Sequence, residues 1–578
     1  MIRELVEFSR RLPKGTLPHD ALDYVPVAID CVIDRKGNFK RFIVHEKQNT
    51  LAERITAKKG KARLLVDKPE EVLRYGKNAK KKHQLFRAKV DEYRSIKELS
   101  PVFSFYESNR SNGVEKARTA FRKEVEEKQR GGNIAFLCLG ENKRLHENHS
   151  IHAAIIANFE SSMANLRDKR FDRCSICGLS SNPIADLPHG MIKRVPAGQT
   201  AGCALISYNF NATESYGLRG NENSSLCTRC ARAYVVAFNW FLSNGSLKPN
   251  EKGKEIYMYK NRKNISDDTA VVFWLRNAVE TTLLDVLDNP KEDSVRAIFD
   301  SVFEGRNTAL RHLDTDTFYA LTLSGTAARI AIRDWIETSL DNVRANLATW
   351  FQDIEVVRYD PDRSKLVKHH PRFSTLVWNV KSKSAKDVLH GRIGAVLWKC
   401  AVMGHSPPLW LLNAVLNRIR AEQGNVTPER VALLKLFLNR TSNNKEGVKY
   451  MATHDETNDN IAYVCGQIFS VLESIQYHAS GGNLNAGIRE RFFSFASTMP
   501  STAFGRLMKL AQHHLSKIRG DKPGLAVNLD KKLQELMSRV ESTRFPAVFS
   551  LEDQASFAIG YYHQRQKDFT TKPNSKAE

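Results

Sequence analysis

Two pairs of cysteines constrain the first half of the chain more than any other feature. Cys174 and Cys177 are separated by two residues, and Cys227 and Cys230 repeat that spacing. Such pairs can place four thiolate sulfurs about 2.3 Å from one tetrahedral zinc ion. The 49 residues between the pairs exceed the span of a usual zinc ribbon, but the free energy of loop closure rises only logarithmically with length. The spacing therefore predicts a structural Zn²⁺ site; four unrelated buried thiols are the alternative.

The remaining cysteines lie in apolar stretches, which predicts positions in the core. They are Cys31, Cys138, Cys203, Cys400 and Cys465. The N-terminal sequence MIRELVEFSRRLPKG is typical of an amphipathic helix and lacks the apolar core of a signal peptide. No run of about 18 uncharged apolar residues occurs, so we expect no membrane span and a cytoplasmic location.

At 578 residues the chain exceeds what one hydrophobic core supports, so about two to four domains are expected. In the first half, residues 25–46 predict two strands around a turn at Gly37 and Asn38. Further predicted elements are strands at 134–139, 271–276 and 317–324, helices at 151–166, 231–245 and 329–352, and a polar, basic linker or partner-facing stretch at 353–393.

After residue 394 the pattern becomes helical. Apolar residues recur at helical spacing from Ile461 to Ile475, and again from Phe504 to Leu515. Pro523 and Gly524 predict a break, further helices are expected at 530–540 and 552–564, and the tail 572–578 is expected to be disordered. The pattern favours a helical bundle.

These patterns predict an α+β protein with a mixed α/β N-terminal region, a zinc-clipped insertion and an all-helical C-terminal bundle. The expected domains are a basic α/β domain at 1–170, a loop-rich insertion at 171–232, a mixed α/β segment and linker at 233–393, and the bundle at 394–578.

Lysine and arginine total 88 against 64 acidic residues, a net charge of +24 that favours polyanionic partners. Residues 54–89 hold thirteen of these cations and three acids. Two clusters are candidates for DNA contact, and a solvated charged face is the alternative. Their members are Lys58, Lys59, Lys61 and Arg63, and Lys77, Lys80, Lys81 and Lys82.

Motifs for common enzyme chemistry are absent from the sequence. We find no GxxxxGK[ST], GxSxG or HExxH motif. The dipeptides His19-Asp20 and His454-Asp455, and the pairs at His369 and His513, lack the further spaced ligands of a metallohydrolase. We therefore expect no catalytic residues.

Several long segments resemble the large-subunit family of the type I-C CRISPR surveillance complex, Cascade. One is the stretch 204–217, ALISYNFNATESYG, which precedes an alanine-rich helix at 230–242. The others are 319–350, typical of a strand, turn and helix in the family, and 482–492 with 510–515. Together with the N-terminal hairpin, these segments span nearly the whole chain.

The resemblance implies a non-catalytic subunit of a ribonucleoprotein in the prokaryotic cytoplasm. Such a subunit recognises the protospacer-adjacent motif in target double-stranded DNA, promotes R-loop formation and helps recruit the helicase-nuclease. The implied partners are the guide RNA, the backbone and guide-end-capping subunits, and a small helical subunit.

The resemblance also suggests where DNA is contacted. The neighbourhood of Asp67 and Lys68 is the first candidate for motif reading, and Gln199 with Asn209 the second. The alternative for the latter pair is that polar side chains bond to their own turns. Basic residues of the bundle can line a path for displaced strand, or form only an exposed helix face. They are Arg489, Arg491, Arg506, Lys509 and Lys517.

In this family an internal translation start can release the C-terminal part as a separate small subunit. Met451 precedes the helix at Ile461, so a start there predicts a product of residues 451–578.

Two other functions remain open at this point. One is a zinc-containing DNA nuclease or recombinase that uses the His-Asp or His-His residues. The other is a free-standing zinc-containing DNA-binding regulator, which would bind a specific sequence without guide RNA.

Overall fold

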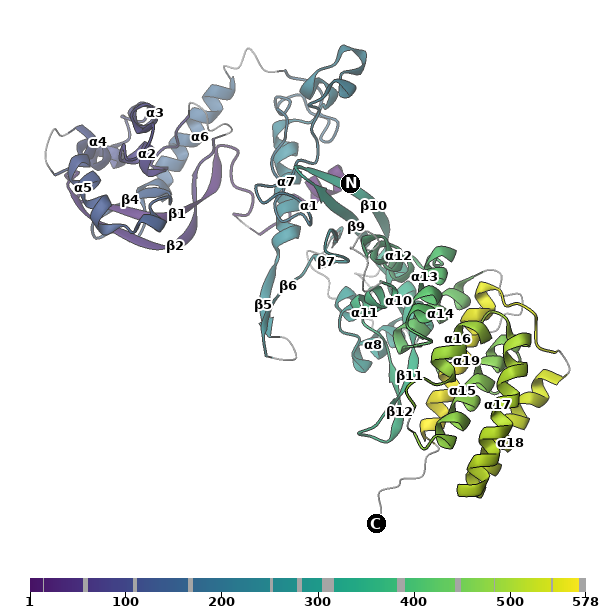
Figure 1. Cartoon of the computed structure of the whole chain (residues 1–578). Helices are drawn as coiled ribbons and strands as arrows, with labels where there is room; N and C mark the ends of the chain where they lie inside the picture. The colour runs from purple at the N-terminus through teal and green to yellow at the C-terminus, as the bar shows by residue number, and fades with distance from the viewer. Residues whose placement is uncertain are drawn as a thin grey trace. The chain divides into compact units, whose positions relative to one another are not determined.

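The chain divides into two compact units in a computed structural model (Figure 1). We call them the N-terminal unit, Ile2–Gly190 with Ile206–Ala237, and the C-terminal unit, Met191–Leu205 with Phe238–Glu578. The structure describes residues 1–13, 15–55, 61–107, 112–164, 170–249, 253–277, 283–303, 316–381, 390–441, 449–482, 484–541 and 544–570.

The N-terminal unit is built on a four-stranded sheet of order β2-β1-β4-β3. Strand β1 pairs antiparallel with β2 and parallel with β4, and β3 pairs antiparallel with β4. The strands are β1 (Leu22–Ile33), β2 (Phe39–Glu53), β3 (Val66–Asp67) and β4 (Ile134–Cys138). The helices are α1 (Ile2–Ser9), α2 (Pro69–Val72), α3 (Ala79–Asp91), α4 (Ser100–Glu107), α5 (Val114–Glu124), α6 (His149–Ala164) and α7 (Thr228–Ser243), which runs into the second unit.

The hairpin predicted at 25–46 is confirmed, and its turn explains why. The Asp34 carboxylate accepts hydrogen bonds from the backbone N–H groups of Lys36 and Asn38, each at 2.9 Å. Gly37 adopts a φ of +80°, and a Cβ there would lie 2.4 Å from the backbone nitrogen of Phe105. The hairpin therefore requires glycine for both conformation and packing.

The C-terminal unit begins with an antiparallel sheet of order β10-β9-β8-β7. Its strands are β7 (Arg262–Asn264), β8 (Thr269–Leu275), β9 (Thr317–Thr326) and β10 (Arg329–Ser339). Two-stranded ribbons are formed by β5 (Gly245–Pro249) with β6 (Glu255–Tyr259), and by β11 (Val356–Asp360) with β12 (Lys365–His369).

The helix predicted at 329–352 is wrong in its first half. Residues Arg329–Ser339 form β10, which pairs along its length with β9 after a tight turn at Ala327, where φ is +51°. Alternating β-branched residues such as Ile330 and Ile332 suit a strand, and pairing with β9 outweighs the helical periodicity. Helix α10 (Leu340–Ile354) starts only where the Ser339 hydroxyl accepts from the backbone N–H of Asn342, at 3.2 Å.

The segment 353–393, predicted to be a linker or a partner-facing stretch, contains β11, β12 and α11 (Phe373–Val380), so the linker alternative is wrong. Val356, Phe373, Leu376 and Val377 are buried in the core of the unit. Polar residues of this segment lie on the exposed sides of its strands and helix. From one sequence alone, such a segment has the same polar composition as a linker.

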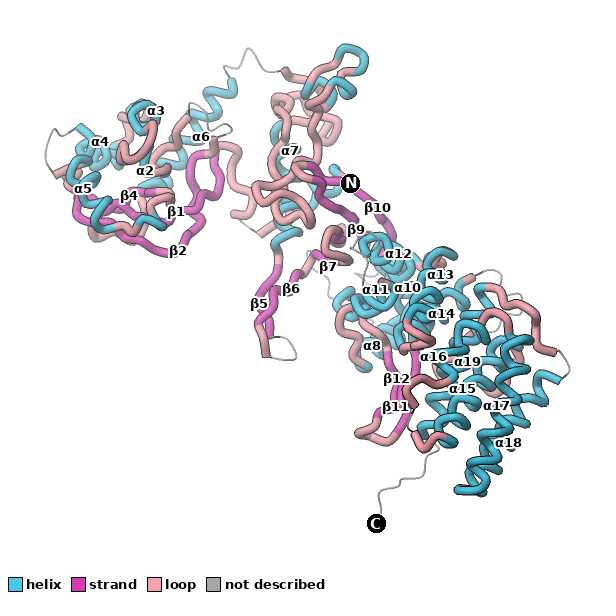
Figure 2. Tube along the Cα trace, viewed as in Figure 1, coloured by secondary structure: helices cyan, strands magenta, loops and turns pink. Residues whose placement is uncertain are grey.

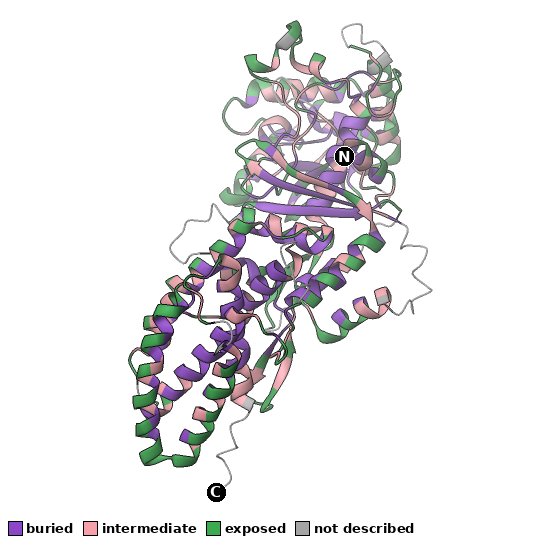
Figure 3. Ribbon diagram, turned by 90° about the vertical axis from the view of Figure 1, so that its right-hand side faces the viewer, coloured by how far each residue is buried: buried purple, intermediate pink, exposed green. Residues whose placement is uncertain are grey.

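Helices fill the rest of the unit, as expected, and Figure 3 shows buried residues on their inner sides. They are α8 (Glu292–Phe303), α12 (His390–Met403), α13 (Leu409–Ala421), α14 (Pro428–Arg440), α15 (Ile461–Ala479), α16 (Ile488–Ala496), α17 (Pro500–Asp521), α18 (Pro523–Glu541) and α19 (Leu551–Thr570). The tail 572–578 lies outside the described residues.

Helix α15 is the centre of this bundle. Every residue from Ala462 to Leu472 is buried. It packs on α19 at two glycines: a Cβ at Gly466 would lie 2.0 Å from the Phe557 carbonyl oxygen, and one at Gly560 2.1 Å from that of Tyr463. The two helix backbones are therefore too close for any side chain at either position.

We expect Gly466→Ala and Gly560→Ala to lower the free energy of unfolding by about 1–3 kcal/mol each, because the added methyl groups force the helices apart. Urea or thermal unfolding of the full chain measures the change.

Gly505→Ala in α17 is the matched control. A Cβ there meets nothing within 4 Å, so the same substitution should raise the free energy of unfolding by about 0.5–1 kcal/mol through helix propensity. Equal effects at buried and exposed glycines would contradict the close packing.

Candidate metal centre and nucleic-acid interface

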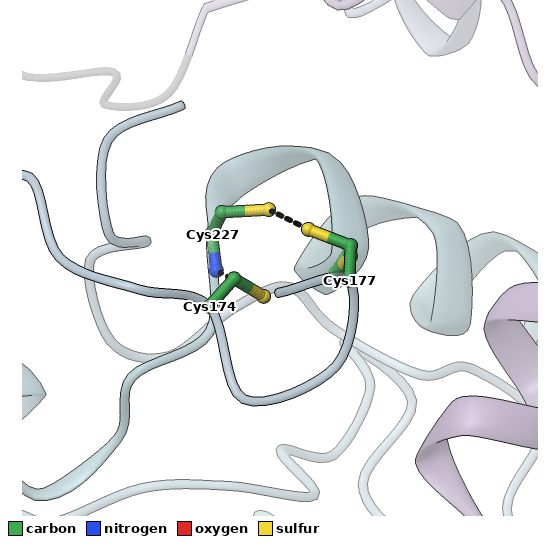
Figure 4. Close-up of side chains that lie close together, drawn as sticks. Cys174, Cys177 and Cys227 are labelled. Atoms are coloured by element: carbon green, nitrogen blue, oxygen red, sulfur yellow. Dashed lines mark hydrogen bonds between the residues drawn. The ribbon is translucent and has the colours of Figure 1, made fainter. Parts of the chain in front are cut away.

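The two predicted cysteine pairs come together in the N-terminal unit. Cys174 and Cys177 lie in a turn closed by Gly178, whose N–H donates to the Cys174 carbonyl at 2.9 Å and whose φ is +73°. Cys227 directly precedes α7, and Cys230 lies in its first turn. Figure 4 shows the side chains of Cys174, Cys177 and Cys227 turned toward one another.

Backbone hydrogen bonds hold the two pairs in place. The N–H of Ser175 donates to the Ser225 carbonyl, and that of Ala185 to the Leu226 carbonyl, both at 2.8 Å. The N–H of Thr228 donates to the Pro183 carbonyl at 2.9 Å. The turn with the first pair and the start of α7 are therefore joined independently of any ion.

The four sulfur atoms lie within 4.8 Å of one another, with Cys177 Sγ and Cys227 Sγ 3.9 Å apart. A tetrahedral ion with metal–sulfur bonds of about 2.3 Å requires sulfur–sulfur distances of about 3.8 Å. Cys174, Cys227 and Cys230 are buried and Cys177 is partly exposed. The cluster could therefore hold a metal ion such as zinc.

The electrostatics of the cluster favour a thiolate at Cys227, whereas burial raises the pKa of Cys177. A hydrogen bond with the Cys230 side chain lowers the pKa of Cys227 to about 5, against the opposing effect of burial. The same interaction raises the pKa of Cys230. The backbone N–H of Cys227 also donates to Cys174 Sγ at 3.4 Å. Because thiolates are the form that binds metal, the stabilised thiolate of Cys227 is suited to a cation.

The other five cysteines are buried, as predicted from their apolar surroundings. Burial raises the pKa of both Cys400 and Cys465 to about 12, which keeps these thiols protonated at neutral pH.

The first basic cluster is only partly described. Lys58 and Lys59 lie outside the described residues, Lys61 is exposed and Arg63 is partly buried. Next to them, the buried Asp67 carboxylate accepts from the backbone N–H groups of Arg63 and Lys68, each at 3.0 Å. The Lys68 ammonium group donates to the Gly131 carbonyl at 2.5 Å and remains partly exposed.

The second cluster lies at the start of α3. Lys77, Lys80 and Lys81 are exposed, and Lys82 forms an ion pair with Glu71 at 3.2 Å. Arg74, absent from the predicted set, is also exposed in the turn before α3, with a φ of +54°. No sequence motif predicts a role for Arg74. Its exposure is a feature of the folded chain, in which it lies in a left-handed turn.

Gln199 and Asn209 belong to different units. The Gln199 side-chain amide donates to the Gly202 carbonyl at 2.9 Å. This contact is the one that the alternative interpretation expects, in which the side chain bonds to its own turn. Asn209 is exposed in the loop between residues 205 and 223.

The basic residues of the bundle divide into two kinds. Arg489 is partly buried and forms an ion pair with Glu490. Arg491, on the same helix, is exposed, as are Arg506, Lys509 and Lys517 on α17. The last three recur at helical spacing and form one exposed basic face.

Two of the histidines considered for catalysis have partners in the fold. His370 Nε2 lies 3.2 Å from the Glu355 carboxylate, and His454 bonds to Gln564 and Gln467. Asp20 pairs with Arg232 at 2.7 Å. Within the described ranges, the four cysteines are the one group of three or more metal-ligating side chains that gathers closely.

Comparison with known families identifies the chain over nearly its whole length. The family described as CRISPR-associated protein (Cas_Csd1) matches residues 5–569. The chain belongs to the Csd1 family of CRISPR-associated proteins. No match is found among curated proteins.

Membership of the Csd1 family confirms the resemblance inferred from the sequence. The family match includes both units, all four clustered cysteines and the basic residues of α3 and α17. In the described part of the chain, no helix is long and apolar enough to cross a membrane.

Proposed function

We propose that this Csd1-family protein is the non-catalytic large subunit of a type I-C Cascade. In this role it recognises the protospacer-adjacent motif in double-stranded DNA, promotes R-loop formation and helps recruit the helicase-nuclease. The observation that carries the proposal is the family match over residues 5–569. The other partners are the guide RNA, the backbone and guide-end-capping subunits and a small helical subunit, in the prokaryotic cytoplasm.

The charge distribution supports a role in DNA binding. In an RNA-guided complex, base pairing reads the target sequence and protein reads only a short flanking motif. Exposed lysines such as Lys77, Lys80 and Lys81 suit attachment to phosphates, which carries no sequence information. The junction of β3 and α2, where the Lys68 ammonium group donates to the Gly131 carbonyl, suits a contact with base edges. Gln199 and Asn209 are the second proposed contact.

The α17 face supports a second contact. Arg506, Lys509 and Lys517 present three cations along one exposed side of a helix, and Arg491 adds a fourth on α16. Such a row can follow the phosphates of a displaced single strand.

We expect Lys68→Ala to reduce discrimination between intact and scrambled flanking motifs, because one base contact is worth roughly 1–3 kcal/mol. The triple substitution of Lys77, Lys80 and Lys81 by Ala should weaken binding to both duplexes equally. It should also lower the slope of log K against log salt by about 0.9 for each phosphate that is no longer neutralised.

Gel-shift binding of the reconstituted guide-RNA complex to both duplexes, with and without this chain, measures these effects. Lys128→Ala is the control, since Lys128 is 79% exposed and lies outside both clusters. Equal binding without the chain would contradict the function. DNA cleavage by the isolated chain with a divalent metal would contradict the non-catalytic role.

We further propose that the cysteine cluster binds structural Zn²⁺. Four thiolate ligands fill a tetrahedral coordination sphere, so the site has no open position for substrate. The ion would reinforce the joint between the turn at Cys174 and the start of α7, which the backbone hydrogen bonds already define.

Elemental analysis of the purified full chain should find one zinc ion per molecule. Replacing Cys174 and Cys177 by Ser should remove the ion and lower Tm by several degrees, because the free energy of metal binding stabilises the folded state. Cys465→Ala is the control: it alters a buried core thiol and should leave the zinc content unchanged. A metal-free chain with the same Tm as the wild type would contradict the proposal.

Met451 remains the proposed start of a separate small subunit. A product from Met451 would contain α15 to α19 complete. It would lack partners that α19 has in the full chain: Tyr562 Oη donates to the Val357 carbonyl at 2.8 Å, and Gln566 Oε1 accepts from the Tyr359 N–H at 2.7 Å.

Intact-mass analysis of the expressed gene should therefore reveal the full chain and a shorter product that begins at Met451. Met451→Leu should remove the shorter product and retain the full chain. A short product with a different first residue would contradict this start.

A further inference from the structure

Tyr216 is the most exposed large apolar residue of the described chain. Its side chain is 100% exposed, and the next in rank, Val548, is 67% exposed. Its backbone is left-handed, with a φ of +62°. Residues other than glycine, asparagine and aspartate rarely adopt this conformation. A tyrosine held in an unfavourable backbone conformation without burying its ring contributes nothing evident to the stability of the fold.

The loop around Tyr216 contains short turns closed by backbone hydrogen bonds. None of residues 205–214 and 216–223 is buried. Short turns bond the loop to itself: the Thr213 N–H donates to the Phe210 carbonyl at 2.9 Å, and the Gly217 N–H to the Glu214 carbonyl at 3.2 Å. The second of these turns contains Tyr216 and sets its left-handed conformation. Figure 2 shows this region between α6 and α7 as mostly loop.

The end of this loop is attached to the cysteine cluster. Ser225 accepts from the Ser175 N–H at 2.8 Å, two residues before Cys227. Arg170 also donates to the Asn221 carbonyl at 3.5 Å. The loop therefore leaves a fixed base and presents Tyr216 to solvent, an arrangement that suits a ligand contact more than a packing role.

The residues near Tyr216 favour a nucleobase over a protein surface. Protein interfaces have an apolar centre from which charged residues are depleted. In this loop the exposed apolar side chains, Tyr216, Phe210 and Leu218, lie instead among amide, hydroxyl and charged groups. Exposed Asn211 and Glu214 can bond to the edges of bases. Arg173 and Arg229, which adjoin Cys174 and Cys230 in the sequence, are exposed and add positive charge to the same unit. Aromatic rings with nearby cations are the usual elements of single-strand recognition.

We propose that Tyr216 stacks on an unpaired nucleobase when the duplex is opened. This contact rests on the proposed function. It would add base stacking by Tyr216 to the recognition of the flanking motif. The unpaired base can come from either DNA strand or from the guide RNA, because all three offer the same aromatic face.

Fluorescence of 2-aminopurine tests the contact, since stacking on an aromatic ring quenches this base. The probe is placed in turn near the flanking motif in the target strand, in the displaced strand and in the guide RNA of the reconstituted complex. We expect quenching in one of these positions with the wild type and with Tyr216→Phe. Tyr216→Ala and Tyr216→Gly should abolish the quenching and slow R-loop formation about tenfold or more.

Tyr216→Gly separates function from folding. Glycine adopts positive φ without strain, and the exposed ring makes no buried packing that the substitution would remove, so Tm should stay unchanged or rise. A large fall in Tm would show that the ring packs in the fold and would overturn the proposal. Tyr477→Ala, which removes a tyrosine that is 50% exposed on α15, is the control and should leave the signal unchanged.

The remaining outcomes distinguish this inference from the proposed function. If the complex needs the chain and reads the flanking motif normally, but no Tyr216 variant alters quenching, the stacking proposal alone fails. Loss of a subunit from the complex with unchanged quenching would assign Tyr216 to a protein interface and overturn it. If the complex binds without the chain, the isolated full chain is tested on a single-stranded probe, where quenching that depends on Tyr216 supports the contact by itself.

Discussion

The joining of two cysteine pairs that are 49 residues apart is the constraint on which residues 170–185 and the start of α7 depend. Around it, the segment between α6 and α7 forms short turns and buries few side chains. Backbone bonds such as that from Ser175 to Ser225 align the two ends, and the four sulfurs then meet at distances that suit one ion. The loop that carries Tyr216 ends within this frame, because Ser225 bonds to Ser175 beside Cys174.

The C-terminal unit depends on a different constraint, the close contact of α15 and α19 at Gly466 and Gly560. Polar groups are buried beside this contact. Lys435 on α14 is fully buried and donates to the Glu355 carbonyl, and burial lowers its pKa to about 8. His563 on α19 bonds to the Tyr463 hydroxyl at 2.9 Å. His563 thus joins α19 to α15, and the Tyr562 hydroxyl, which donates to the Val357 carbonyl, joins α19 to a segment before Met451. A separate product from Met451 would therefore need a partner to cover the face of α19 that this segment occupies.

Much of the fold could be predicted because its signals are local. The hairpin at 25–46, the strands at 134–139 and 317–324 and the helices after 394 follow from residue periodicity and turn chemistry. The errors occurred where pairing between distant segments decides. Residues 329–339 carry both helical and strand periodicity, and only the neighbouring β9 supplies backbone partners that make the strand the more stable choice. The linker alternative for 353–393 was wrong because its buried residues, Phe373 and Leu376 among them, are diluted by polar ones.

The candidate site shows the same division. The sequence by itself determined the two spaced cysteine pairs, the surplus of positive charge and the membership of the Csd1 family, because spacing, composition and long motifs do not depend on how the chain folds. Only the tertiary structure decided which of these side chains are available. It bonds the Gln199 amide to its own turn, places Lys68 against Gly131 and exposes the whole ring of Tyr216. The exposure of a side chain and its hydrogen-bond partners depend on residues far away in the chain. A pattern of neighbouring residues in one sequence does not predict these distant contacts.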